Sequence, residues 1–148
     1  MRELTEWQRE QFTISTDFSR LNIDFIHDYL CNRSYWAQGR SRDVVEKAIA
    51  NSLSFGVYDG KEQIGYARVV TDYATFAWLC DVFITEAYQG RGLGKWLVSA
   101  IVNHPEVGQL KYIVLATRDA HELYRKYGDF GPFRFPDRMM MRYREPIR

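Results

Sequence analysis

The first fifty residues have hydrophobic spacings typical of one short strand followed by two helices. Residues 12–15 are mostly apolar or β-branched and predict the strand. Asp17 is placed to cap a first helix. The apolar positions of that helix recur at helical spacing at Leu21, Phe25 and Tyr29. A second helix is predicted to begin at Ser41, because Gly39 breaks the pattern before it. The apolar residues that follow share one helical face: Val44, Val45, Ala48 and Ile49.

After residue 52 the pattern changes to that of extended strands. Residues 53–58 and 63–70 flank Asp59-Gly60, a pair suited to a tight turn, so an antiparallel hairpin is predicted. Residues 76–84 are nearly all apolar and predict a central strand buried on both faces, with Asp81 as its one acid. The order of elements predicts an α/β fold with a single three-layer domain, in which a twisted, mixed but mostly antiparallel sheet carries helices on both faces.

The next segment combines the end of that strand with a glycine-rich loop and a helix. Glycines at positions 90, 92 and 94 leave the backbone free of Cβ atoms, so that a ligand can come close. An amphipathic helix follows and ends before Pro105. Its apolar positions are Leu93, Trp96, Leu97, Ala100 and Ile101. The N–H groups of its first turn, its dipole and the charges of Arg91 and Lys95 favour a bound pyrophosphate.

Two common nucleotide-binding motifs do not match this loop. A Walker loop requires Gly five residues before Gly94 and Ser or Thr after Lys95, but the sequence has Gln89 and Trp96 at those positions. The dinucleotide fingerprint Gly-x-Gly-x-x-Gly also fails, because the third glycine comes one residue early. The sequence therefore disfavours both nucleoside triphosphate chemistry and hydride transfer.

The loop does match a third pattern, which reads Gln or Arg, two residues, Gly, one residue, and Gly or Ala. Residues 89–94 read Gln-Gly-Arg-Gly-Leu-Gly and satisfy it in full. They resemble the acetyl-CoA motif of the GNAT family of N-acetyltransferases. Downstream, residues 112–116 predict a buried strand parallel to the central one, and residues 117–130 are similar to the family's second cofactor helix, with Asp129 inserted near its end. The resemblance covers residues 53–143.

The resemblance implies the acyl-CoA N-acyltransferase fold, with acetyl-CoA as the acyl donor and an amine as the acceptor. The pantetheine arm would lie along the splayed central strand, where a backbone N–H near Phe83 or Ile84 would stabilise the oxyanion. Tyr124 matches the tyrosine that faces the cofactor sulfur and would donate a hydrogen bond or proton to the departing thiolate. The cofactor-binding residues that the resemblance implies are Val82, Phe83, Ile84, Gln89, Gly90, Arg91, Gly92, Leu93, Gly94, Lys95 and Thr117.

The two candidate catalytic residues each keep a second interpretation. Periodicity alone would place Tyr124 in the core, and only the resemblance assigns it to the leaving group. Asp81 is either a general base that acts on the amine through water or a buried acid satisfied by backbone groups or by an arginine such as Arg68. A base would help, because an amine with a lysine-like pKa of about 10.4 is almost wholly protonated at pH 7.

The acceptor site is expected between the N-terminal helices, residues 17–52, and the start of the central strand. One candidate segment places two large aromatic residues in a predicted interhelical loop, where exposed rings indicate binding rather than packing. The other offers a carboxylate and aromatic faces to a cationic amine. Either segment could equally be a plain loop, and neither indicates whether the acceptor is a peptide or a small-molecule amine. The expected substrate-binding residues are Tyr35, Trp36, Asp72, Tyr73 and Phe76.

Composition adds few constraints. The chain has 148 residues, 20 of them basic and 19 acidic, and its net charge of +1 provides no overall field for nucleic acid or a membrane. Residues 1–6 lack the apolar run of a signal peptide, and no stretch approaches the roughly 20 apolar residues of a membrane span, so a cytoplasmic monomer or homodimer is expected. Cys31 and Cys80 are interpreted as buried thiols, and no metal site is expected from the three scattered histidines.

Two other classes of function compete with the enzyme. A catalytically inactive acyl-CoA sensor or an interaction module could use the same cofactor cleft, although an intact Tyr124 disfavours it. A nucleic-acid binder would draw on the basic C terminus, and the near-neutral net charge disfavours that reading. The residues of that basic segment are Arg134, Arg138, Arg142, Arg144 and Arg148.

Overall fold

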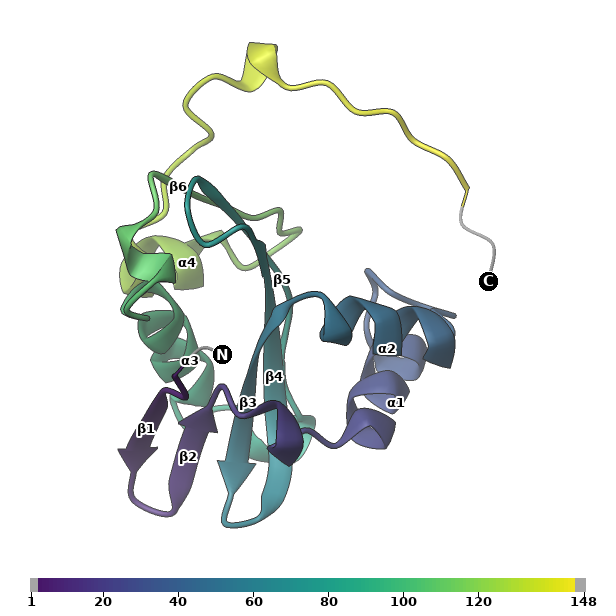
Figure 1. The fold of residues 1–148 in the computed structure, drawn as a ribbon, viewed down its shortest axis with the longest axis vertical. Helices are drawn as coiled ribbons and strands as arrows, with labels where there is room; N and C mark the ends of the chain where they lie inside the picture. Colours follow the sequence, from purple (N-terminus) through teal and green to yellow (C-terminus); the bar gives the residue numbers. More distant parts are fainter. Residues whose placement is uncertain (1–2, 146–148) are drawn as a thin grey trace.

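The computed structural model describes residues 3–145 and shows a six-stranded sheet with helices packed against it (Figure 1). Residues 1–2 and Arg148 lie outside the described residues. The strands are β1 (Glu6–Arg9), β2 (Phe12–Ser15), β3 (Leu53–Asp59), β4 (Glu62–Thr71), β5 (Phe76–Ile84) and β6 (Tyr112–Val114). The α-helices are α1 (Ile23–Arg33), α2 (Arg42–Ala50), α3 (Leu93–Val102) and α4 (His121–Gly128). The short 3₁₀ segments are η1 (Phe18–Arg20), η2 (Glu86–Tyr88), η3 (Val107–Gln109) and η4 (Pro136–Arg138).

The strands follow their chain order across the sheet, and every neighbouring pair is antiparallel except β5 with β6, which is parallel. The predicted hairpin is confirmed, and its turn places Gly60 at a φ of 58°, where glycine is favoured. The predicted parallel pairing of residues 76–84 with the strand at 112 is confirmed as well. β1 was not predicted, because Glu6 and Gln8 make its pattern too polar to be recognised.

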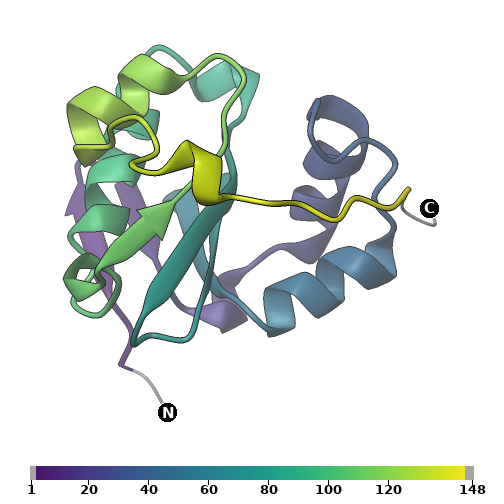
Figure 2. The same cartoon turned by 90° about the horizontal axis from the view of Figure 1, so that it is seen from above.

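The sheet forms the middle of three layers, as predicted. α1 and α2 cover one face, while α3 and α4 cover the other (Figures 1 and 2). The core beneath α3 is closed by Leu93, Leu97 and Ile101, each of which is at most 1% exposed. On the opposite face, Tyr66 and Phe83 pack among the buried residues of α1 and α2. The apolar positions on the two faces of the sheet therefore belong to two separate cores.

The caps of the N-terminal helices follow the sequence only in part. Asp17 caps the short η1, where its side chain accepts a hydrogen bond from the Ser19 N–H. The prediction that Asp17 caps the first long helix is therefore wrong: α1 begins one turn later, and Asn22 caps it by accepting from Phe25 N. Ser41 caps α2, as predicted.

An irregularity in β5 shapes the surface above it. Tyr66 pairs with Phe83 and Arg68 with Cys80, so two β5 residues, Asp81 and Val82, oppose a single residue of β4. This is a β-bulge, and it places Asp81 at a φ of 54°. The pairing of β5 with β6 covers only the first three residues of β5. Beyond that point the two strands separate, and β5 is not buried on both faces as predicted, because alternate residues along it are only partly buried.

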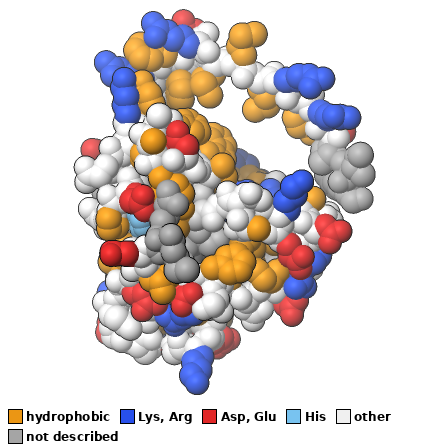
Figure 3. All heavy atoms as spheres, in the orientation of Figure 1, with side chains coloured by type: hydrophobic (Ala, Val, Ile, Leu, Met, Phe, Trp, Pro, Cys, Tyr) orange, Lys and Arg blue, Asp and Glu red, His pale blue; other side chains and the backbone are white. Residues whose placement is uncertain are grey.

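The C-terminal segment lies apart from these layers. Residues 131–145 are exposed, and the segment leaves α4 and arches away from the body (Figures 1 and 3). Hydrophobic and basic side chains alternate along the arch (Figure 3). Among residues 3–145, no helix has the length and hydrophobicity needed to cross a bilayer.

Candidate functional site

A cleft of about 350 Å³ opens where β5 and β6 separate. It exists because β5 bends at its bulge while the chain after β6 turns away toward α4. Three segments that lie far apart in the sequence form its walls: β5 with its neighbour β4, the chain from the end of β6 into α4, and the loop between α1 and α2. The lining residues are Tyr35, Trp36, Arg40, Arg68, Trp78, Leu79, Cys80, Asp81, Val82, Leu115, Ala116, Thr117, Asp119, Ala120 and Tyr124.

The glycine-rich loop follows the cleft-lining strand directly, through η2. Gly90 and Gly92 have φ values of 84° and 78°, which favour glycine. Gly92 is the N-cap of α3, and no side chain caps the helix. A Cβ atom at Gly90 or Gly94 would meet nothing within 4 Å, so the backbone there faces open space. The first-turn N–H groups of α3 and the positive end of its dipole are thus available to an anion.

Cationic side chains surround the loop. Arg91 lies over the ring of Tyr88 at 5.0 Å, and Lys95 over the ring of Tyr127 at 5.4 Å. Arg9 of β1 adds a third cation, because its Nη2 donates to the Arg91 carbonyl at 3.1 Å and its guanidinium lies 5.1 Å from the centre of the Trp96 ring. Sequence reasoning missed Arg9, since 82 residues separate it from its partner.

The residues predicted to bind the cofactor take several different positions. Val82 lines the cleft. The Phe83 side chain points to the opposite layer, where it stacks on Tyr29 with ring centres 3.8 Å apart, so only its backbone can serve the cleft side. Gln89 does not point at the open space of the loop, because its Nε2 donates to the Ile84 carbonyl at 2.8 Å and ties the loop to the end of β5.

Tyr124 projects from α4 into the cleft and is 9% exposed. Its hydroxyl makes no hydrogen bond within residues 3–145, and its ring packs edge-on against Phe130 at 5.9 Å. Burial raises the pKa of Tyr124 to about 12, and the nearby Tyr35 adds to the effect. The side chain is therefore a neutral hydrogen-bond donor that no group within residues 3–145 engages.

Thr117 and the inserted Asp129 both have a structural role at the ends of α4. Thr117 lines the cleft, but its Oγ1 accepts a hydrogen bond from Ala120 N at 3.0 Å and shapes the start of the helix. The inserted Asp129 is the C-cap of α4, at a φ of 58°. This left-handed residue lets Phe130 N donate to the Tyr124 carbonyl, so the insertion ends the helix without displacing Tyr124.

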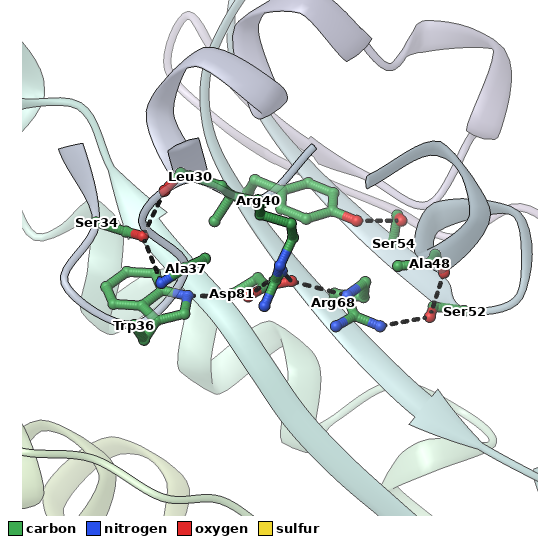
Figure 4. A network of polar contacts seen from close by, with 11 residues as sticks. Leu30, Ser34, Trp36, Ala37, Arg40, Ala48, Ser52, Ser54, Arg68 and Asp81 are labelled. Carbon is green, nitrogen blue, oxygen red and sulfur yellow. Dashed lines mark hydrogen bonds and ion pairs between the residues drawn. The ribbon is translucent and has the colours of Figure 1, made fainter. Parts of the chain in front are cut away.

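Asp81 is the centre of a polar network on the cleft wall (Figure 4). Its side chain is 2% exposed. Oδ1 accepts from Trp36 Nε1 at 2.9 Å, and Oδ2 accepts from Arg68 Nε at 2.8 Å. Arg40 Nη1 donates to both oxygens, at 3.2 and 3.0 Å. The sequence-based alternative in which Arg68 satisfies Asp81 is confirmed.

The aromatic pair of the α1–α2 loop reaches the cleft, as predicted. Tyr35 and Trp36 meet edge to face at 5.1 Å and are 43% and 38% exposed. The Tyr35 hydroxyl accepts from Arg118 N at 3.1 Å, and the Arg118 guanidinium stacks on the Tyr35 ring at 3.7 Å. These contacts join the loop to the opposite wall, 83 residues further along the chain.

The second predicted acceptor segment does not reach the cleft, whose lining includes none of Asp72, Tyr73 and Phe76. These residues form the turn between β4 and β5. The Asp72 carboxylate accepts hydrogen bonds from the backbone N–H groups of the turn and from the Thr75 hydroxyl. Those donors lower its pKa. The carboxylate that resembled an amine-binding group in the sequence therefore stabilises a local turn.

The comparisons with known proteins agree with this geometry. The sequence profile described as "Acetyltransferase (GNAT) domain" matches residues 50–128. A protein of Gibberella zeae that is assigned to the acetyltransferases is 30% identical over 141 residues, which cover 81% of this chain and 79% of the relative. The chain belongs to the GNAT family.

Solved GNAT structures have the same fold. A crystal structure of a Xanthomonas campestris protein assigned to the GNAT family matches with a TM-score of 0.84 and 41% identity, and covers 97% of this chain and 94% of that one. A GNAT acetyltransferase of Elizabethkingia anophelis, crystallised with acetyl-CoA bound, matches with a TM-score of 0.60 and 16% identity. That match covers 80% of this chain and 76% of that chain, and it shows the shared fold.

A cysteine also lies in the GNAT cleft. Cys80 is a free thiol. Burial, together with the charge of Asp81, raises the pKa of Cys80 to about 11. A thiol with so high a pKa is almost entirely protonated near neutral pH, and the thiolate is the reactive form. Cys80 therefore lines the cleft as a protonated thiol.

The GNAT cleft contains charged residues that sequence reasoning did not assign to it. Neither Arg40 nor Asp119 was among the predicted site residues. Both line the cleft. No local signal identifies Arg40, because its partner Asp81 is 41 residues away.

The network predicts a stability effect. Asp81→Asn is expected to lower the free energy of unfolding by about 3 kcal/mol, because it leaves the guanidinium of Arg68, 14% exposed, without its counterion. Asparagine tolerates the left-handed φ at this position, so the lost charge dominates. Urea unfolding measures the effect. Asp24→Asn, which removes an 82% exposed partner of Arg42, is the control and should cost less than about 1 kcal/mol. Equal losses in the two variants would contradict a buried ion pair.

Proposed function

We propose that this GNAT protein transfers the acetyl group of acetyl-CoA to a primary amine of a small-molecule or peptide acceptor, by direct attack of the amine on the thioester. One arrangement carries the proposal. β5 runs from the cleft wall at Asp81 and Val82 directly into the loop at residues 89–94, and Tyr124 faces the cleft from α4. β5 thus connects a loop that can bind phosphates to the part of the cleft where the acyl group would react.

The loop fits the pyrophosphate of CoA. Its glycine backbone faces open space, and its N–H groups lie at the positive end of α3. Arg91, Lys95 and Arg9 bring full positive charges to the same place. Leu93, 1% exposed, anchors the first turn of the helix in the core, so the N–H groups are fixed before a ligand arrives.

The bulge of β5 fits the pantetheine arm. The pairing of β5 with β6 ends at Trp78, so the edge of β5 that carries Asp81 and Val82 has no paired strand on its β6 side. Backbone groups in this position can hydrogen-bond an extended arm that lies beside the strand. An N–H of this strand would also stabilise the oxyanion of the acyl group, a contribution worth about 3–4 kcal/mol in other enzymes.

We assign Tyr124 the role of hydrogen-bond donor to the leaving sulfur. When bound, acetyl-CoA supplies a thioester whose CoA sulfur departs as a thiolate. Full proton transfer to a thiol with an ordinary pKa of about 8.5 from a tyrosine with a pKa of about 12 would be uphill by about 5 kcal/mol. Donation of a hydrogen bond without transfer avoids that cost, and the Tyr124 hydroxyl has no competing partner within residues 3–145.

We assign Asp81 a positioning role rather than that of a general base. Its two oxygens already accept hydrogen bonds from Trp36, Arg40 and Arg68. The side chain is 2% exposed, and both guanidiniums of the cleft wall pair with it. The function of the carboxylate is then to hold Trp36 and Arg40 in the cleft.

Titration calorimetry with acetyl-CoA, ATP and NADH tests the donor. Acetyl-CoA should bind, and neither nucleotide should bind comparably, because the loop meets the sequence requirements of neither rival motif. Tight binding of ATP or NADH without binding of acetyl-CoA would refute the proposal.

The transfer itself is tested with a panel of amines, by following the release of free CoA thiol. Turnover of at least one amine, with its acetylated product detected by mass spectrometry, is the expected result. Binding of acetyl-CoA without turnover of any amine would contradict an enzyme and favour an acyl-CoA sensor.

A further inference from the structure

The loop between α1 and α2 is held in a fixed shape that presents two side chains to the cleft. The Ser34 hydroxyl donates to the Leu30 carbonyl at 2.7 Å and accepts from Ala37 N at 3.0 Å. Gly39, at a φ of 75°, donates its N–H to Cys31 O at 3.0 Å. A loop tied in this way delivers Trp36 and Arg40 to the cleft in one geometry, before any ligand arrives.

Arg40 keeps free donors in that position. Its Nη1 is bound to Asp81, whereas its Nε and Nη2 make no hydrogen bond within residues 3–145. Its side chain is 24% exposed and lines the cleft. Arg68, by contrast, is 14% exposed and donates to both Asp81 and Ser52. Arg40 is therefore the guanidinium of the network that can receive a ligand.

The charges around the cleft favour an anion over a second cation. Asp81 is fully engaged with the two guanidiniums of its network. The other lining carboxylate, Asp119, has a 67% exposed side chain and lies 3.7 Å from Arg118. Two guanidiniums, those of Arg40 and Arg68, and two carboxylates thus line the cleft, and both carboxylates already have partners, so the free edge of Arg40 is the open charged group. A polycation would be repelled here, whereas a carboxylate would meet the free edge of Arg40 in the fork geometry that such groups prefer.

The chemistry of the amine leads to the same class of acceptor. The cleft lining has no unengaged buried base, so the acceptor must supply a neutral amine by itself. A lysine-like amine is neutral in fewer than about one molecule in a thousand at pH 7, whereas an α-amino group with a pKa of about 7.7–8.0 is neutral in about one in ten. That range applies where no carboxylate lies beside the amine. In a free amino acid the adjacent carboxylate raises the amine pKa, and a guanidinium that cancels its charge lowers the pKa toward that range.

We propose that the acceptor is an α-amino acid or a similar amine that carries a carboxylate next to its amino group, with Arg40 binding the carboxylate. The side chain of this acceptor is apolar, because Tyr35, Trp36 and Trp78 supply aromatic walls to the cleft. This inference rests on the acetyltransferase function proposed above, and it names the substrate class of the same cleft.

Matched pairs of amines test the inference. Phenylalanine is compared with 2-phenylethylamine, and tryptophan with tryptamine, at saturating acetyl-CoA. Phenylalaninamide has an amine of low pKa and no carboxylate, so it separates carboxylate recognition from amine basicity. The wild-type protein should show a kcat/KM at least about tenfold higher for the amino acid than for the amine or the amide. Spermidine, as a polycation, should be the poorest acceptor.

Variants of Arg40 then test whether this residue binds the carboxylate of the acceptor. Arg40→Gln should bring the ratio between paired acceptors close to one, mainly through KM, and Arg40→Lys should retain an intermediate ratio because it keeps the charge without the fork. Arg42→Gln removes an arginine two residues away that pairs with Asp24 and Glu46 outside the cleft, and should leave the ratio unchanged. Thermal melting of each variant accompanies the assays.

The outcomes separate the inference from the function on which it rests. Faster turnover of the decarboxylated amine, of the amide or of spermidine would overturn the inference and leave the acetyltransferase function intact. A ratio that Arg40→Gln does not change would overturn the assignment of Arg40. If only amines outside these pairs are acetylated, the inference fails and the proposed function stands. If acetyl-CoA binds and no amine of any kind is acetylated, the proposed function fails, and the inference fails with it.

Discussion

The Tyr124→Phe variant is expected to bind acetyl-CoA with a nearly wild-type Kd and to turn over about 10- to 10,000-fold more slowly. The substitution removes one hydroxyl and keeps the ring that packs against Phe130. The lower bound corresponds to the loss of one hydrogen bond to a charged group, and the upper bound to the loss of a general acid. Because the hydroxyl makes no hydrogen bond within residues 3–145, its removal leaves no internal partner unsatisfied.

Calorimetry gives the Kd of this variant, and the release of CoA thiol with the best acceptor gives its kcat. Tyr112→Phe is a matched control, since it removes the hydroxyl of a tyrosine on β6 that is 48% exposed and outside the cleft lining. Its rate should equal that of the wild type. An equally fast Tyr124→Phe would show that Tyr124 serves only the packing of α4.

The pKa of Tyr124 indicates whether its hydroxyl donates a hydrogen bond to the leaving thiolate or transfers its proton to it. Burial raises it to about 12, so the hydroxyl remains protonated throughout the pH range of ordinary assays. A donor this weak stabilises a thiolate by sharing its proton rather than by releasing it. We therefore expect the observed loss to lie nearer the lower bound than the upper one.

The sequence predicts the cofactor end of the site because its signals are local. Three glycines, two cations and an amphipathic helix lie within about a dozen consecutive positions, and helical spacing alone places Leu93 and Leu97 in the core. The hairpin around Gly60 is equally local. In both the loop and the hairpin, the residues that form the structure are neighbours in the sequence, so a local pattern is enough to predict it.

The proposed acceptor end was predicted only in part, from Tyr35 and Trp36, because distant residues build the rest of it. Trp36 and Arg40 meet Asp81 across 45 and 41 residues, and the bulge that brings them together leaves no sequence signal. Asp72 was predicted to bind the acceptor because a carboxylate that forms a turn and a carboxylate that binds an amine look alike in sequence. Only the tertiary structure shows that one is satisfied locally and the other forms part of a cleft wall.

The cofactor loop allows the second large effect to be predicted. Gly92→Asp is expected to weaken acetyl-CoA binding at least about a hundredfold, because it places an anion where we propose that the pyrophosphate binds. Two like charges about 4 Å apart repel each other by about 4 kcal/mol at an effective dielectric constant of 20. The fold should survive. Aspartate tolerates a left-handed φ better than most residues do, and the nearest atom to a Cβ at this position is Arg9 Nη2, at 3.5 Å.

Gly60→Asp is the matched control for charge and strain. Gly60 has a comparable φ of 58°, a Cβ there meets nothing within 4 Å, and it lies in the β3–β4 turn, outside the cleft lining. Calorimetry should show unchanged acetyl-CoA affinity for Gly60→Asp and a lost affinity for Gly92→Asp, while circular dichroism shows both variants folded. Wild-type affinity in a folded Gly92→Asp variant would show that the phosphates bind elsewhere, because a carboxylate at position 92 would repel phosphates bound at the start of α3.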